Sequence, residues 1–141
     1  RAIRRMISDM QNRGYNVSNS YSGYRSYGVQ SQLYQSYVNR DGRYLADTYS
    51  ARPGHSEHQT GLVFDLINWN GALIESNNEA TWIAQNAHKY GFIVRYPRGK
   101  EYITGYQYEP WHLRYVGNKA TSIYNSGKSL EEYYGILGGG Y

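Results

Sequence analysis

Residues 61–67, Gly-Leu-Val-Phe-Asp-Leu-Ile, decide the fold, because this run of leucine, β-branched and aromatic residues predicts a buried β-strand. Side chains alternate along a strand, so Gly61, Val63, Asp65 and Ile67 share one face and the three residues between them share the other. Asn70-Gly71 follows the strand and predicts a hairpin turn. The pattern therefore places one ionisable residue, Asp65, in the middle of an apolar strand.

A carboxylate on a buried strand needs a partner, since burying an unpaired charge is costly. The more common partner would be a nearby arginine, and Arg25 and Arg114 are the candidates. The other possibility is a metal ion. On the strand alone, the sequence leaves both possibilities open.

Around this strand, the pattern of apolar residues and turn residues predicts alternating helices and strands. A helix is expected from Ile3, with Ile3, Met6, Ile7 and Met10 on one face and Gly14 after its end. Further helices are expected from Tyr27 to Asn39, with Val29, Leu33 and Tyr37 facing inward, and from Ala80 to Tyr90, with Asn77 or Asn78 as N-cap and Gly91 as its stop. Two short helices close the chain, the second beginning at Ser129 with the capping box Ser129-x-x-Glu132.

Three further strands are expected over Tyr15–Tyr24, Phe92–Tyr96 and Trp111–Val116, and residues 43–60 are expected to form a long polar loop. Interleaved helices and strands with hairpin-like connections predict an α+β fold with a mainly antiparallel sheet flanked by helices. A length of 141 residues predicts one domain, spanning 1–141.

Composition excludes several classes of protein. The chain has no cysteine, so disulfide scaffolds, thiolate zinc sites and cysteine nucleophiles are excluded. No apolar run approaches the roughly 20 residues of a membrane span. The net charge of +4 comes from scattered basic residues without an aromatic-lined stripe, so nucleic-acid binding is not expected. We expect a monomer.

Two histidines change the interpretation of Asp65. His58 lies just before the strand, and His112 lies in the segment Glu109-Pro110-Trp111-His112. Two histidines and one carboxylate make a three-ligand set for Zn²⁺ that leaves a fourth position open for water. Pro110 disfavours a helix at Glu109, which therefore precedes the strand in extended chain, close to His112. Glu109 then has the position of a general base for that water.

These residues resemble the VanY-type zinc D-alanyl-D-alanine carboxypeptidases. Residues 56–65, Ser-Glu-His-Gln-Thr-Gly-Leu-Val-Phe-Asp, are similar to the family pattern S-x-H-x-x-G-x-A-x-D, with Val63 where alanine is usual. Glu109-Pro110-Trp111-His112 is similar to E-x-W-H, and residues 22–26 are similar to S-G-Y-R-S. The three motifs occur in the family's order, and the resemblance spans residues 22–116.

The resemblance implies a role for each matching residue. His58, Asp65 and His112 would bind zinc at the sheet, and Glu109 would activate water and protonate the leaving amine. Arg25 would meet the substrate carbonyl or carboxylate, because a guanidinium suits oxyanions. Ser56 and Gln30 are candidate hydrogen-bond partners for the substrate terminus.

The three residues expected to contact substrate, Arg25, Ser56 and Gln30, each also have an ordinary structural interpretation. For Arg25 it is a surface salt bridge, and for Ser56 a loop-stabilising turn. Gln30 could equally be a solvated residue on a helix face. His88 is expected at the surface near a helix C-terminus, and His55 has no role in the family pattern.

The implied substrate is a peptidoglycan stem peptide from which a C-terminal D-alanine is removed, outside the cell, in the wall or anchored to the membrane. Residues 51–61 look most like the L,D-carboxypeptidases of Gram-positive bacteria, which act on tetrapeptides. D,D-carboxypeptidase activity on pentapeptides and a cell-wall endopeptidase remain alternatives. Hedgehog-type domains resemble this fold and keep the zinc site while serving in binding, and a catalytically silent, zinc-containing wall-binding module would likewise keep some ligands. This alternative is disfavoured because Glu109 and Arg25 are both present.

Overall fold

The structure, a computed structural model, describes residues 1–22, 27–49, 51 and 62–135. A four-stranded sheet in the order β1-β2-β4-β3, antiparallel throughout, forms its centre. The strands are β1 (Tyr21–Ser22), β2 (Val63–Leu66), β3 (Phe92–Val94) and β4 (His112–Tyr115). The predicted α+β fold, in a single domain with a mainly antiparallel sheet, is confirmed.

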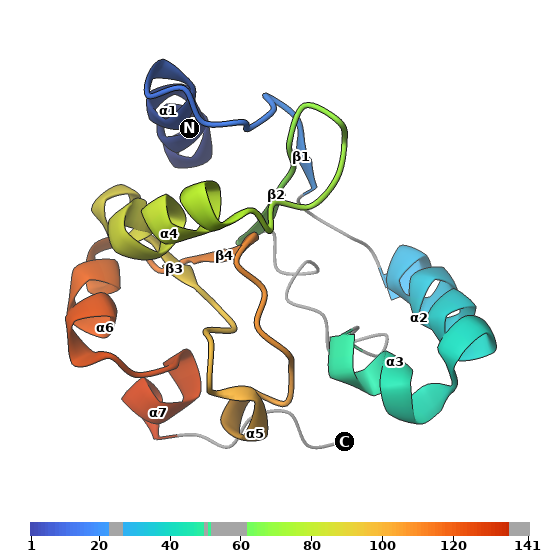
Figure 1. Cartoon of the computed structure of the whole chain (residues 1–141). Helices are drawn as coiled ribbons and strands as arrows, with labels where there is room; N and C mark the ends of the chain where they lie inside the picture. Colours follow the sequence, from blue (N-terminus) through green and yellow to red (C-terminus); the bar gives the residue numbers. More distant parts are fainter. Residues whose placement is uncertain (23–26, 50, 52–61, 136–141) are drawn as a thin grey trace.

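Helices surround this sheet (Figure 1). They are α1 (Ala2–Asn12), α2 (Tyr27–Asp41), α3 (Arg43–Tyr49), α4 (Asn77–Asn86), α5 (Glu101–Thr104), α6 (Ala120–Ser126) and α7 (Leu130–Tyr134), with short 3₁₀ turns η2 (Ala87–Tyr90) and η3 (Gly117–Lys119). Among the described residues, no helix is long and apolar enough to span a membrane.

One face of the sheet carries the main core. Leu66, Leu113 and Phe92, which alternation places on the same face, pack with α1 and α4. The apolar stripe of α1 is buried as predicted, through Ile3, Met6, Ile7 and Met10. A smaller cluster forms around Ile93, where α6 and α7 contribute Ala120, Ile123 and Leu130.

The predicted ends of several elements are confirmed. Gly14 and Gly91 both have positive φ, at 85° and 89°, and follow a helical segment. The turn at Asn70-Gly71 closes a hairpin in which Ile67 and Leu73 form an isolated bridge. Ser129 and Glu132 form the predicted capping box at the start of α7. The N-cap of α4 is Ser76, one residue before the predicted pair.

Two predictions about residues 27–60 were wrong in part. The segment expected to be one loop contains α3, because Gly42 at φ 83° redirects the chain and α3 then packs against α2, with Ala46 fully buried. The inward face of α2 is shifted by one residue. Val29 is 49% exposed, whereas Gln30 and Tyr34 are buried.

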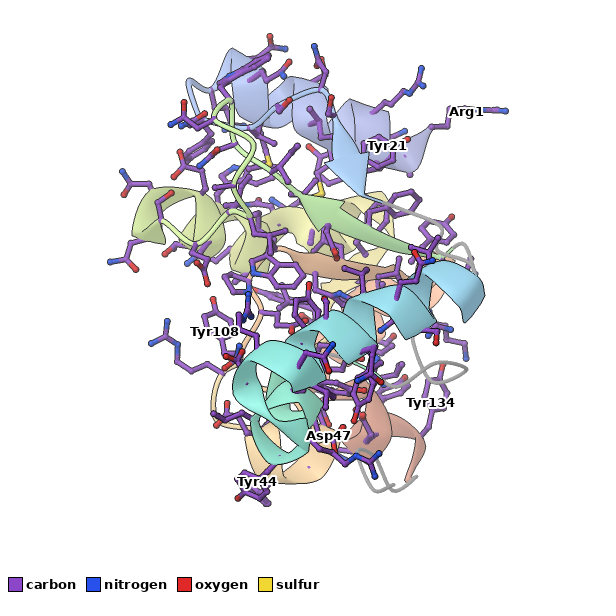
Figure 2. The ribbon with its side chains drawn as sticks, turned by 90° about the vertical axis from the view of Figure 1, so that its right-hand side faces the viewer. Arg1, Tyr21, Tyr44, Asp47, Tyr108 and Tyr134 are labelled. Atoms are coloured by element: carbon purple, nitrogen blue, oxygen red, sulfur yellow. The ribbon has the colours of Figure 1, made fainter. Side chains whose placement is uncertain are left out.

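This shift has a polar cause. The Tyr34 hydroxyl donates to Asp47 Oδ1 at 2.7 Å. The face of α2 that carries Tyr34 is therefore turned toward α3. Figures 1 and 2 show the two helices as a pair beside the sheet, with Tyr44 pointing away at the outer end of α3.

The strand expected over 15–24 is reduced to β1 in the described residues. The preceding segment is held by single contacts such as Ser18 N–H to Ile67 O at 2.8 Å, and not by a continuous ladder. The helix α5, which sequence periodicity did not indicate, has only four residues.

Candidate active site

Asp65 and His112 face each other across the two central strands. Residues 65 and 112 are direct partners in the β2–β4 register. This pair is a non-hydrogen-bonded one. The ladder bonds on either side of it run from Leu66 N–H to Trp111 O and from Tyr115 N–H to Leu62 O. In an antiparallel ladder such pairs bring their side chains closest together. The backbone register therefore juxtaposes the two side chains.

The side chains meet at hydrogen-bonding distance. His112 Nδ1 lies 3.0 Å from Asp65 Oδ1, and both side chains are almost fully buried, at 6% and 7% exposed. The structure thus pairs Asp65 with a histidine. Arg114, one of the arginines considered as its partner, lies opposite Val63 in the same register.

Glu109 joins this pair from the segment before β4. Its Oε1 lies 3.7 Å from His112 Nδ1, and its side chain is 5% exposed. The Glu109 N–H donates to Tyr96 O at 3.1 Å, while the His112 N–H donates to Glu109 O at 3.3 Å. These two backbone bonds hold the predicted base against the predicted ligand.

Two carboxylates around one imidazole make a buried site rich in negative charge. Such a site favours a cation, because buried charges must be compensated. The donor set suits Zn²⁺, which binds histidine nitrogen and carboxylate oxygen. A tetrahedral zinc keeps such ligands roughly 3.3 Å apart, given metal–ligand distances of about 2.0–2.2 Å, close to the separation of Nδ1 and Oδ1.

The described residues do not complete a metal site by themselves. Within 1–22, 27–49, 51 and 62–135, no group of three histidine, aspartate or glutamate side chains has metal-binding geometry. The predicted third ligand, His58, lies outside the described residues, as do Arg25, Ser56 and His55.

Gln30 is the one predicted substrate-binding residue that the structure describes. It is 1% exposed, so it does not lie on a solvated helix face. Its side-chain Nε2 donates to the carbonyl oxygen of Ala51, next to the segment that contains Ser56 and His58. The buried Gln30 amide therefore ties α2 to Ala51.

His88 has a structural environment of its own. Its ring stacks on Tyr124 at 4.1 Å between centroids, and its Nε2 lies 3.1 Å from Gln85 O. It is therefore part of the contact between η2 and α6, as well as being near a helix end.

Sequence reasoning missed the aromatic packing behind the site. Tyr96, 6% exposed, stacks on the His112 ring at 4.9 Å with the planes inclined by 28°. The Tyr106 ring in turn packs against the Tyr96 ring, with 4.6 Å between the ring centroids. No sequence pattern marked either tyrosine among the 18 in the chain.

Comparison with known proteins gives consistent matches. The family model described as VanY, D-alanyl-D-alanine carboxypeptidase, matches residues 1–118. Among curated proteins, the putative carboxypeptidase YodJ of Bacillus subtilis (strain 168) is 42% identical over 139 residues, covering 94% of this chain and 50% of YodJ. The chain thus spans about half the length of this curated relative.

Two solved structures extend the comparison. The L,D-carboxypeptidase DacB of Streptococcus pneumoniae is 55% identical, with a TM-score of 0.95 over 99% of this chain and 76% of DacB. The vancomycin-resistance D,D-pentapeptidase VanY, solved in complex with Zn(II), is 35% identical, with a TM-score of 0.81 over 94% of this chain and 79% of that protein.

Proposed function

We propose, because the chain belongs to the VanY family of D-alanyl-D-alanine carboxypeptidases, that it is a zinc-dependent carboxypeptidase removing the C-terminal D-alanine from peptidoglycan stem peptides. The observation that carries the proposal is the buried cluster in which Asp65 Oδ1 and Glu109 Oε1 lie 3.0 and 3.7 Å from His112 Nδ1. In this proposal residues 1–141 form one catalytic domain, which acts on the cell wall outside the cell.

His58, Asp65 and His112 would hold the zinc ion. When bound there, Zn²⁺ would act as a Lewis acid on the scissile carbonyl and lower the pKa of a water molecule toward about 7. The β2–β4 register, in which Asp65 and His112 are direct partners, supports this assignment. His58 would complete the set from the segment that precedes β2.

Glu109 would move the protons of the reaction. Its carboxylate would take a proton from the attacking water and later give it to the leaving amine of D-alanine. Its backbone bond to Tyr96 O keeps it beside His112 without using the side-chain oxygens. Arg25 would stabilise the developing oxyanion or the terminal carboxylate, and Ser56 and Gln30 would hydrogen-bond the substrate terminus.

We favour L,D-carboxypeptidase activity on tetrapeptides. This preference is supported by the higher similarity to the L,D-carboxypeptidase DacB, 55% identical at TM-score 0.95, than to the D,D-pentapeptidase VanY, 35% identical at TM-score 0.81. D,D-carboxypeptidase activity on pentapeptides is the second candidate, supported by the family description.

The test is mass spectrometry of purified, zinc-loaded protein incubated separately with muropeptide tetrapeptide and pentapeptide. Loss of one alanine from the tetrapeptide alone is the expected result. Loss from the pentapeptide alone would replace the L,D assignment by the D,D one. If neither peptide is shortened although the protein holds one zinc, the carboxypeptidase proposal is wrong, and an endopeptidase or a wall-binding module replaces it.

The ligand set has a separate test. His58→Ala should lose zinc, because two remaining ligands bind far more weakly than three. Inductively coupled plasma mass spectrometry after dialysis should give close to one zinc per wild-type chain and far less for the variant. His88→Ala, a histidine packed on Tyr124 away from the cluster, is the matched control and should keep its zinc. Full zinc occupancy in His58→Ala would show that the ligand set is wrong.

A further inference from the structure

A buried ion pair joins the last described helix to the chain that leaves strand β3. Arg95 Nη1 lies 2.7 Å from Glu131 Oε1, and the two side chains are 10% and 2% exposed. Removing both charges from water costs about as much free energy as their attraction returns. A contribution to stability is therefore a weak reason for the presence of a buried ion pair. Glu131 belongs to α7 and lies beyond residues 1–118, the range that the family model matches.

Arg95 lies directly opposite the proposed ligand His112. Its N–H donates to His112 O at 3.1 Å, and the bond from Val116 N–H to Gly91 O continues the same β3–β4 pairing. Opposed residues of an antiparallel pair carry their side chains on the same face of the sheet. The Arg95 side chain is therefore on the face that bears His112 and Asp65.

The Tyr96 ring connects the guanidinium to the imidazole. Arg95 Cζ lies 4.9 Å from the centroid of the Tyr96 ring, and this ring stacks on His112, also at 4.9 Å. The carbonyl oxygen of Tyr96 accepts the Glu109 N–H at 3.1 Å. One residue thus contacts both the proposed ligand and the proposed base.

We infer that Arg95, held by Glu131, is a positioning residue that fixes the Tyr96 ring and, through it, the orientation of the His112 imidazole toward zinc. A cation over an aromatic face and a stacked ring both have preferred geometries, so each contact restricts the next one. Residues behind metal ligands orient them and tune the affinity for the metal. The inference rests on the proposed function, and it makes α7, in the lower left of Figure 1, part of the site.

The decisive variant replaces the ion pair by apolar side chains, Arg95→Met together with Glu131→Leu. Such an exchange commonly keeps or raises stability, so the melting temperature should not fall while the cation over Tyr96 is lost. We expect the zinc dissociation constant, measured by competition with a chromogenic chelator, to rise about 10- to 100-fold. We expect kcat on the alanine-terminated substrate to fall while KM changes by less than about threefold.

A milder variant and a matched control accompany it. Glu131→Gln keeps the size of the side chain but removes its charge, and it should weaken zinc binding in the same direction. Lys100→Gln removes the neighbouring, more exposed ion pair of α7, in which Lys100 Nζ lies 2.9 Å from Glu132 Oε1. It should leave zinc affinity unchanged. Wild-type zinc affinity in both Glu131→Gln and the folded double variant would overturn the inference.

A failure of the proposed function would be recognised separately. If the wild-type protein neither binds zinc nor shortens a stem peptide, the proposed function fails. The ring-nitrogen signals of His112 in the nuclear magnetic resonance spectrum of the metal-free protein then test the positioning role. We expect one sharp set in the wild type and broadened signals in the double variant. Equally sharp signals in both proteins would contradict the inference.

Discussion

Glu109 shows how much chemistry a single residue contributes. Glu109→Gln keeps the side-chain size and the backbone bond to Tyr96 O, so the fold and the zinc site should persist. Turnover of the tetrapeptide should fall by about 10²- to 10⁴-fold, because the amide accepts no proton from water. Steady-state kinetics with zinc stoichiometry measured in parallel check this. Glu101→Gln, which changes a surface glutamate of α5, is the control, and wild-type turnover in Glu109→Gln would remove Glu109 as the base.

The junction between η2 and β3 depends on one glycine. Gly91 has φ +89°, and a Cβ there would lie 2.8 Å from Tyr115 Cε1. Moving the Tyr115 ring would disturb its edge contact with Phe92, 5.4 Å between centroids. Gly91→Ala should therefore lower the free energy of unfolding by about 2 kcal/mol, from left-handed backbone strain and from steric contact together. Urea unfolding checks the value.

A second glycine isolates the steric contribution. Gly127, after α6, has φ +68°, but a Cβ there would meet nothing within 4 Å. Gly127→Ala should cost only about 1 kcal/mol, the backbone contribution. Equal losses in the two variants would show that Tyr115 moves aside without cost and that the close approach to Gly91 is unimportant.

At the scale of the whole molecule, Glu79 links the chain after α1 to the start of α4. The Ser76 hydroxyl donates to its Oε1, and the Asn16 N–H donates to its Oε2 at 3.0 Å. Burial acts to raise the pKa of Glu79, but these hydrogen bonds, with that of its own backbone N–H, hold the pKa below its ordinary value. A carboxylate whose pKa is lowered by folding stabilises the fold at neutral pH. This stabilisation is lost as the pH falls through the pKa of the folded state.

The consequence is a pH-dependent difference between wild type and Glu79→Gln. At pH 7 the variant should melt at a lower temperature, and the gap should narrow as the pH falls from about 5 to about 3, because protonation removes the advantage of the carboxylate. Differential scanning calorimetry across this range measures the gap. Glu75→Gln, at an exposed position nearby, controls for the change in net charge. A gap that stays constant with pH would contradict this role.

Sequence patterns anticipated the elements that local chemistry determines. The stripe of α1, the stop at Gly91 and the capping box at Ser129 each depend on residues within a turn or two of one another. Elements held by distant contacts were missed. The helix α3 is stabilised by its packing against α2, with Ala46 fully buried, and the buried face of α2 follows the bond from Tyr34 to Asp47. Neither contact leaves a periodic pattern in the sequence.

The candidate site divides in the same way. The sequence by itself determined the donor types, the strand alternation that places Asp65 among apolar residues, and the order in which Glu109 and His112 follow it. Only the tertiary structure decided that Asp65 and His112 are opposed at their closest register, that Gln30 is buried, and that Arg95 and Glu131 pair behind Tyr96. The physical reason is that register and burial depend on contacts between residues far apart in the chain, whereas side-chain chemistry and alternation are fixed residue by residue.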